Sequence, residues 1–364
     1  MSPLMDSVVM AGTDGVKRKM DPSMVTPNDF FIYQGRIKEM FGSMINAPAK
    51  QLALIPSVSY ALSNAFQNIK PKKGGNAITI ADEFPSDYFS LKKWAELHGQ
   101  ELRVIQPPPM GSSERQDWSN QIIEAIDERT AVVNISSVHW MTGFSYNLKA
   151  IGQKCRENKA LFVVDGTQSV GALSIDVRDC NINVLISVAY KWLMGPYSIG
   201  LAYYSELFDD GSPIEESWMN RSNAQNFSRL SEYETEYVPG AGRYEVGESA
   251  NFILLPMLDQ ALRQVLAWGP GEISEYCGSL TDRLIQGGEK LGCIFEPKDC
   301  RSPHLIGMQL PGGIDPVAFK QNLEREKVFI SVRGNSVRVS PHLYNDEKDM
   351  DALLRVMKVS IEGS

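Results

Sequence analysis

The sequence contains few cysteines and histidines, and neither residue type is clustered. Five cysteines and four histidines are spread over 364 residues, and no CxxC pair occurs. This scatter disfavours a disulfide framework and a zinc site. We therefore expect a cytoplasmic protein without a metal. The five cysteines are Cys155, Cys180, Cys277, Cys293 and Cys300.

Long hydrophobic runs and an excess of positive charge are also missing. No apolar run approaches the roughly 20 residues that span a bilayer. The net charge of −8, from 36 basic and 44 acidic residues, disfavours nucleic acid and anionic membranes as partners. Residues 1–20 lack the basic-then-apolar order of a signal peptide. We expect neither a nucleic-acid partner nor a membrane.

Two phosphate-binding fingerprints are absent as well. The chain has no Gly-rich dinucleotide motif after a predicted strand and no GxxxxGK[ST] loop. Nucleotide binding of the usual kinds therefore has no support in the sequence. With 43% apolar residues the chain can nevertheless form one large core and a smaller second domain.

The apolar residues that are present form short runs that alternate with helical patterns. Such alternation predicts an α/β fold with a doubly wound, mostly parallel sheet. A run at 201–204 follows a tight turn, so we expect it to pair antiparallel. We predict an irregular N-terminal arm (1–27), a large domain (28–250) and a small α+β domain (251–364). The predicted strands of the large domain are 52–55, 77–81, 102–106, 131–136, 161–164, 184–188 and 201–204.

Two charged residues follow neighbouring predicted strands in the segment 161–200. Asp165 ends one apolar run, and Lys191 comes shortly after the next. Ligands of such sheets bind outside the carboxyl ends of the strands. One explanation of the two residues is a plain ion pair. Another is a site for a cofactor with an aldehyde and a pyridine nitrogen, because lysine forms Schiff bases with aldehydes and a carboxylate keeps a ring nitrogen protonated.

The residues around this pair resemble the class V aminotransferase family. The matching segments are Asp165-Gly-Thr-Gln168-Ser169 and Ser187-Val-Ala-Tyr190-Lys191-Trp-Leu-Met-Gly195-Pro196, and the resemblance extends over about 52–344. The family contains fold type I enzymes that use pyridoxal 5′-phosphate (PLP), including cysteine desulfurases, selenocysteine lyases and epimerase-like members. The resemblance implies a homodimer. It also implies that Lys191 forms the internal aldimine, that Asp165 faces the pyridine nitrogen and that Gln168 reaches the phenolic oxygen.

The same resemblance implies a set of contacts to the cofactor phosphate. A predicted helix begins after Pro56, and free amides at a helix start favour phosphate. Glu248 replaces the threonine with which desulfurases reach across the dimer to the phosphate of the partner chain's cofactor, so we expect Ser249 or backbone amides to make this contact. The expected phosphate contacts are Ser57, Val58, Ser59, Ser187, Tyr190 and Ser249.

Further residues are expected around the ring and the substrate. Phe84 occupies the position of a ring-stacking histidine in desulfurases, and an aromatic face suits a π-deficient ring. Trp140 replaces an asparagine and either donates its N–H or lines the substrate pocket. Arg338 matches the arginine that binds the substrate carboxylate, a role that suits its planar fork. His139 is a weaker candidate for a substrate contact.

The function implied is PLP-dependent chemistry on an α-amino acid, with a carbanion at Cα. We favour transamination, and β-eliminating C–S lyase activity is the second choice. Epimerisation, a non-catalytic PLP-binding descendant and a structural Asp165–Lys191 pair remain open. Only Gly334-Asn335-Ser336 connects the last predicted strands, and no cysteine lies near it. A persulfide mechanism of the desulfurase type is therefore disfavoured.

Overall fold

The structure is a computed structural model that describes residues 1–333 and 336–362. Its contacts divide the chain into two compact units. Unit 1 comprises 1–105, 122–137 and 148–270, and unit 2 comprises 106–121, 138–147 and 271–364. This division places residues 251–270 with the larger unit. The domain boundaries at 27/28 and 250/251 stay a prediction.

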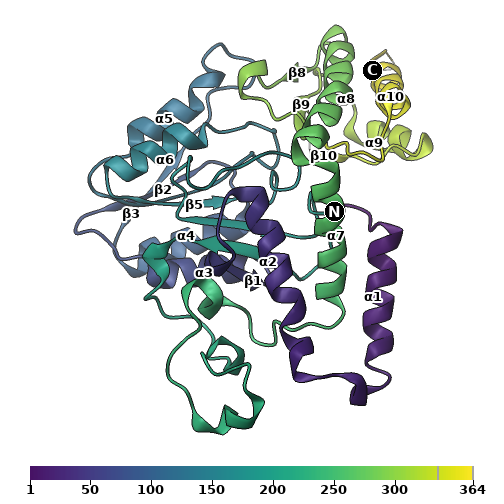
Figure 1. The fold of residues 1–364 in the computed structure, drawn as a ribbon. Coiled ribbons are helices and arrows are strands. Elements are labelled where there is room, and N and C mark those ends of the chain that lie inside the picture. Colours follow the sequence, from purple (N-terminus) through teal and green to yellow (C-terminus); the bar gives the residue numbers. More distant parts are fainter. Residues whose placement is uncertain (334–335, 363–364) are drawn as a thin grey trace. The chain divides into compact units, whose positions relative to one another are not determined.

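Unit 1 is built on a seven-stranded sheet in the order β1-β7-β6-β5-β4-β2-β3 (Figure 1). Pairing is parallel from β3 through β6, whereas β7 is antiparallel to both β6 and β1. The expected doubly wound, mostly parallel sheet is confirmed, and so is the antiparallel strand. The strands are β1 (Leu52–Ile55), β2 (Asn76–Ile80), β3 (Glu101–Ile105), β4 (Thr130–Ser136), β5 (Leu161–Asp165), β6 (Val184–Val188) and β7 (Gly200–Tyr204).

Apolar residues explain why these strands lie in the centre. Each residue of β1, β2, β4, β6 and β7 is buried, as expected for strands covered on both faces. Helix α3 packs against β6 and against α4. The helices of this part of the chain are α2 (Ile32–Ile45), α3 (Val58–Asn68), α4 (Pro85–Leu97), α5 (Trp118–Ala125), α6 (Leu148–Glu157) and α7 (Leu254–Trp268).

The expectation of an irregular N-terminal arm is wrong, because Asp6–Arg18 forms helix α1. The helix packs along α7. A Cβ added to Gly12 would lie 2.6 Å from Sδ of Met257, and one added to Gly15 would lie 2.3 Å from the Phe252 carbonyl oxygen. These glycines allow a close helix–helix approach. Glycine is unfavourable inside a helix, so these two residues weaken the helical signal of the sequence.

Unit 2 contains a four-stranded antiparallel sheet in the order β10-β11-β9-β8. Its elements are α8 (Pro270–Lys290), β8 (Ile294–Phe295), β9 (Ile306–Gln309), α9 (Pro316–Arg325), β10 (Ser331–Arg333), β11 (Ser336–Val339) and α10 (Glu347–Glu362). Two residues of the short β10–β11 connection, Gly334 and Asn335, lie outside the described residues. Among the helices described in 1–333 and 336–362, none is long and apolar enough to cross a membrane.

Candidate active site

The structure brings Asp165, Lys191 and Phe84 together in unit 1. Asp165 is the last residue of β5, and Lys191 follows the end of β6, so both lie at the carboxyl edge of the sheet. The Lys191 Nζ lies 5.7 Å from the centroid of the Phe84 ring. Its charge also acts on the carboxyl group of Asp165. An acid, an amine and an aromatic face therefore share one edge of the sheet.

Asp165 is held in a fixed orientation by its own turn. Its Oδ1 accepts a hydrogen bond of 2.9 Å from the backbone N–H of Thr167. Burial raises the pKa of Asp165, whereas the Thr167 hydrogen bonds and the Lys191 charge oppose this shift. The side chain is 5% exposed. It is a buried acid whose protonation depends on its immediate partners.

A second buried carboxyl group lies beside Asp165, and sequence reasoning missed it. Glu83 accepts hydrogen bonds from the backbone N–H groups of Phe84, at 2.7 Å, and Ser136, at 2.6 Å. Burial raises the pKa of Glu83 to about 7, although these two hydrogen bonds act in the opposite direction. The negative charge of Asp165 raises it further.

A third carboxyl group, that of Asp87 in the first turn of α4, is fully buried. It lies within hydrogen-bonding reach of Asp165, and burial together with the charges of Asp165 and Glu83 raises the pKa of Asp87 well above its usual range. Its Oδ2 has no hydrogen-bond donor among the described residues. A proton on Asp87, donated to Asp165, satisfies both groups. The burial of Glu83 and Asp87 follows from the fold and has no local signal in the sequence.

Two separate elements supply candidate phosphate contacts. Ser57 is the N-cap of α3, and its Oγ accepts from the Tyr60 N–H at 3.2 Å and lies 3.1 Å from the Ser59 Oγ. The first backbone N–H groups of the helix, starting at Val58, have no carbonyl partner within the helix and favour an anion. Ser187 on β6 is fully buried, and its Oγ has no partner among the described residues.

Two other residues that were predicted to bind the cofactor, Tyr190 and Gln168, contact side chains of the same chain. The ring of Tyr190 packs on Tyr197 with centroids 4.6 Å apart. Burial raises the pKa of the Tyr190 hydroxyl, with smaller contributions from Tyr197 and Asp165. The Gln168 Oε1 accepts a hydrogen bond of 3.3 Å from the indole N–H of Trp192, a contact that the sequence did not indicate.

Ser249 lies in a buried polar network of unit 1. Its Oγ is 3.0 Å from the amide nitrogen of Gln34 and 3.4 Å from Oε2 of Glu245. Glu245 in turn forms an ion pair with Lys38. The Ser249 hydroxyl is thus already used within the chain, next to a carboxylate. Its contact with a phosphate stays a prediction.

The remaining predicted residues belong to unit 2. Arg338, on β11, donates from one guanidinium nitrogen to the Trp140 carbonyl oxygen at 2.9 Å and from another to the Ser331 Oγ at 3.3 Å. His139 is buried, and its Nδ1 lies 3.1 Å from the Thr142 Oγ1. These contacts fix the Arg338 side chain and give His139 a structural partner.

The residues of unit 1 fit the predicted cofactor at its ends. The unpartnered Ser187 hydroxyl and the start of α3 suit a phosphate group. Asp165 suits the pyridine nitrogen. Burial raises the pKa of its carboxyl group, and a cationic ring beside it would favour the ionised carboxylate. Lys191 provides the amine and Phe84 an aromatic face. Which residues bind PLP stays a prediction.

Comparison with known proteins gives a consistent result. The model of the family described as aminotransferase class-V matches residues 32–360. An uncharacterized aminotransferase, YcbU, of Bacillus subtilis is 24% identical over 321 residues, covering 85% of this chain and 79% of that protein. The isopenicillin N epimerase of Amycolatopsis lactamdurans is 23% identical, with 88% and 83% covered.

Solved structures agree on the fold. A complex of the cystine C–S lyase C-DES with cysteine persulfide superimposes with a TM-score of 0.83 at 17% identity, covering 97% of this chain and 94% of that chain. The match over 32–360 takes in nearly all of both units. The chain therefore belongs to the aminotransferase class-V family of PLP-dependent enzymes, and PLP is its cofactor.

Proposed function

We propose that this protein is an aminotransferase that acts on an α-amino acid. The observation that carries the proposal is the meeting of Lys191, Asp165 and Phe84 at the carboxyl edge of the sheet, with Lys191 Nζ 5.7 Å from the Phe84 ring centroid. An enzyme of this family needs an amine that moves protons, an acid for the ring nitrogen and an aromatic contact for the ring face. All three come from unit 1.

PLP, when bound, supplies a ring that withdraws electrons from the substrate Cα. Lys191 is the one of these three groups able to accept the Cα proton and return it at another carbon. Asp165 stabilises the protonated ring nitrogen, and Asp87 restricts the Asp165 carboxyl to one orientation by donating a proton to it. In a transamination Lys191 would return this proton on the cofactor side, and hydrolysis by one water would then release the keto acid and leave the amino group on the cofactor.

Arg338 is proposed to bind the substrate α-carboxylate. Its contacts with the Trp140 carbonyl and the Ser331 hydroxyl hold the guanidinium group in place. A guanidinium group has five N–H donors in a planar fork, which matches a carboxylate. Substitution of Arg338 by Ala should therefore raise KM for the amino acid about tenfold or more while the cofactor spectrum is unchanged.

β-Elimination at a C–S bond is the second candidate. The fold neighbour C-DES is named a cystine C–S lyase, and the same Cα deprotonation by Lys191 precedes loss of a β-substituent. Epimerisation, named for the Amycolatopsis relative, also shares this first step. Transamination is preferred because the family description and the Bacillus relative both carry that name.

Turnover of purified holoenzyme with a panel of amino acids tests this proposal. Each amino acid is incubated with and without pyruvate as amino acceptor, and keto acid, thiol and the amine form of the cofactor are measured. Transamination predicts one keto acid per amino acid consumed, accumulation of the amine form without pyruvate, and no activity in Lys191→Ala. Pyruvate and thiol released from cystine without an acceptor would instead support the lyase.

We also propose that the enzyme is a cytoplasmic homodimer. The family resemblance implies that the partner chain completes the phosphate site. All five cysteines are free, as expected in a reducing compartment. Sedimentation of the purified holoenzyme at micromolar concentration tests the dimer, and a monomer with full activity would contradict it.

A further inference from the structure

A pocket of about 450 Å³ lies at the amino-terminal edge of the large sheet. It is lined by Leu161, the first residue of β5, and by Asn183, which precedes β6. Asp165 ends β5 at the opposite edge, roughly 13 Å along the strand at about 3.3 Å per residue. The pocket belongs entirely to unit 1 and is separate from the proposed cofactor site.

The charged residues that line this pocket are all cationic. They are Arg156, Lys159 and Arg178, and no aspartate or glutamate lines it. Within the described part of the chain, none of the three forms an ion pair. One guanidinium nitrogen of Arg156 donates a hydrogen bond of 2.9 Å to the Gln153 Oε1, and its other N–H groups are left for a ligand. Asp176 is close enough to Arg178 to be affected by its charge, but the Asp176 carboxylate accepts from the Asn46 amide and two backbone N–H groups. The pocket therefore carries a local positive charge, although the chain as a whole has a net charge of −8.

Two neutral polar side chains of the pocket, those of Asn183 and Tyr203, can also donate hydrogen bonds. The Asn183 Oδ1 accepts a hydrogen bond of 2.8 Å from the Phe162 N–H, which leaves the amide NH₂ as the group available to a ligand. Tyr203 also lines the pocket, and burial raises the pKa of its hydroxyl to about 12, so it stays a neutral donor. The loop carrying Arg178 is closed by backbone hydrogen bonds, including one of 2.9 Å from Ile182 to Val177.

Apolar side chains form the rest of the wall. Leu161, Val177 and Ile182 line the pocket, and Leu207 lies at it with 73% of its surface exposed. A cavity of this size is in the range that holds small molecules. Guanidinium groups match the geometry and charge of phosphate. The lining thus combines three cationic side chains with an apolar contact surface.

We propose that this pocket is a binding site for a small phosphomonoester with an apolar or aromatic body. Arg156, Lys159 and Arg178 bind the phosphate, and the aliphatic wall contacts the body. An acidic protein segment fits less well, because a pocket of about 450 Å³ has the size of a small-molecule site. The site is independent of the transamination proposal and stands whichever reaction the enzyme performs.

Calorimetric titration of the dialysed holoenzyme tests the proposal. The probes are inorganic phosphate, adenosine 5′-monophosphate and adenosine, at low ionic strength. The holoenzyme is used because its cofactor phosphate already fills the other anion site. The variants are Arg178→Ala and, as a matched control with the same change of charge, Lys93→Ala on the exposed face of α4. Both positions are exposed, so neither variant should impair folding.

The expected result is saturable binding of the monophosphate and phosphate but not of adenosine. Arg178→Ala should weaken binding at least about tenfold, whereas Lys93→Ala should leave it within twofold. Hydrogen exchange at 177–183 should slow when the monophosphate is bound. Absence of saturable binding by both anions, or equal losses in the two variants, would overturn the proposal. Binding of a polyglutamate peptide but not of the monophosphate would overturn the ligand class.

Discussion

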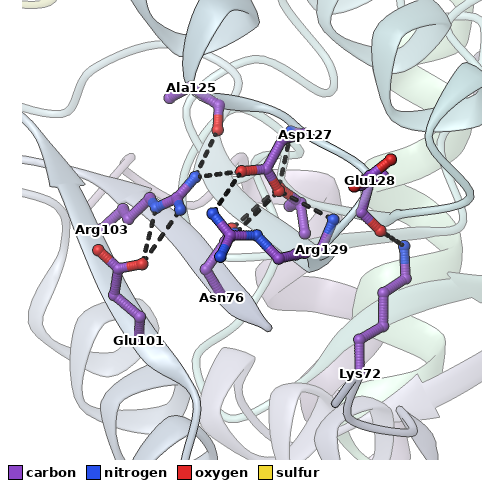
Figure 2. A network of polar contacts seen from close by, with 9 residues as sticks. Lys72, Asn76, Glu101, Arg103, Ala125, Asp127, Glu128 and Arg129 are labelled. Carbon is purple, nitrogen blue, oxygen red and sulfur yellow. Dashed lines mark hydrogen bonds and ion pairs between the residues drawn. The ribbon is translucent and has the colours of Figure 1, made fainter. Parts of the chain in front are cut away.

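The two edges of the large sheet differ in how their charged side chains are partnered. At the amino-terminal edge, Asp127 accepts hydrogen bonds from Arg103 at 2.9 Å, from Asn76 at 3.1 Å and from the Arg129 N–H at 2.9 Å (Figure 2). Arg103 also donates to Glu101 and to the Ala125 carbonyl oxygen. Each charge in this network has a partner of opposite charge or a hydrogen bond.

At the carboxyl edge, three carboxyl groups lie together instead. Asp165, Asp87 and Glu83 are buried side by side, and their pKa values are raised chiefly by burial. The Oδ2 of Asp87 and the Oγ of Ser187 have no partner among the residues that the structure describes. A buried polar group without a partner lowers the stability of a protein. Such groups are therefore rare, and a functional role is one reason for their presence. We infer that the network in Figure 2 stabilises the fold, and we propose that the carboxyl edge is the site of the chemistry.

The largest effect should come from replacing the acid of the carboxyl edge. Asp165→Asn removes the charge that stabilises a protonated ring nitrogen, and it should lower kcat by roughly 10²–10⁴-fold. The free energy of unfolding of the apo-protein should stay the same or rise, because one buried acid of three is neutralised. Steady-state kinetics and urea unfolding of the same samples check both statements.

The matched change at the amino-terminal edge, Asp127→Asn, should lower stability and leave kcat nearly unchanged. Asp127→Asn removes the charge that pairs with Arg103 and leaves its hydrogen bonds weaker. We expect a loss of about 2 kcal/mol in the free energy of unfolding, with kcat within twofold of wild type. A large fall in kcat with unchanged stability would contradict the assignment of this network to the fold.

The stability of the apo-protein should depend on pH with opposite signs at the two edges. The folded pKa of Glu83 is raised to about 7 from 4.5, so the folded state keeps a proton that the unfolded state loses. Stability should therefore fall by roughly 1–3 kcal/mol as pH rises from about 4.5 to 7. Glu83→Gln should reduce this slope, and the raised pKa of Asp87 should account for much of the slope that remains.

The contribution of Asp127 to the free energy of unfolding should change in acid solution. Burial alone would raise the pKa of Asp127, but its hydrogen bonds to Arg103, Asn76 and Arg129 outweigh this and hold it well below 3.8. Its contribution is present above the unfolded pKa and is lost as pH falls below about 4. Unfolding curves of wild type and Asp127→Asn between pH 2 and 5 should converge at the acid end.

The smallest effects are expected from removing one hydroxyl group at each edge, that of Ser187 or that of Thr130. The Ser187 Oγ has no partner among the described residues, whereas the Thr130 Oγ1 donates to the Asn76 side chain and accepts from the Asp127 N–H. Ser187→Ala should leave apo-protein stability within about 0.5 kcal/mol and weaken PLP binding roughly three- to tenfold. Thr130→Val should lower stability by about 1–2 kcal/mol and leave PLP binding unchanged. Equal effects of the two changes would contradict the comparison.

The sequence predicted the sheet well because its signals are local. Short apolar runs such as 131–136 and 161–164 and the turn after Asp165 are enough to place acid and amine at one edge. The three-carboxyl cluster was not predictable, because Asp87 and Glu83 meet Asp165 only through the order of β2, β4 and β5. The helix α1 was missed because Gly12 and Gly15 are helix-packing residues here, and a single sequence does not distinguish such glycines from turns.

The most direct test of the carboxyl edge as the cofactor site is the visible absorption spectrum of purified protein with added PLP. Wild type should show a protein-bound band, and Asp165→Asn should shift that band. Lys191→Ala should lose it, whereas Asp127→Asn should match wild type. A colourless wild-type protein at saturating PLP, or a band that survives unchanged in Lys191→Ala, would contradict the account.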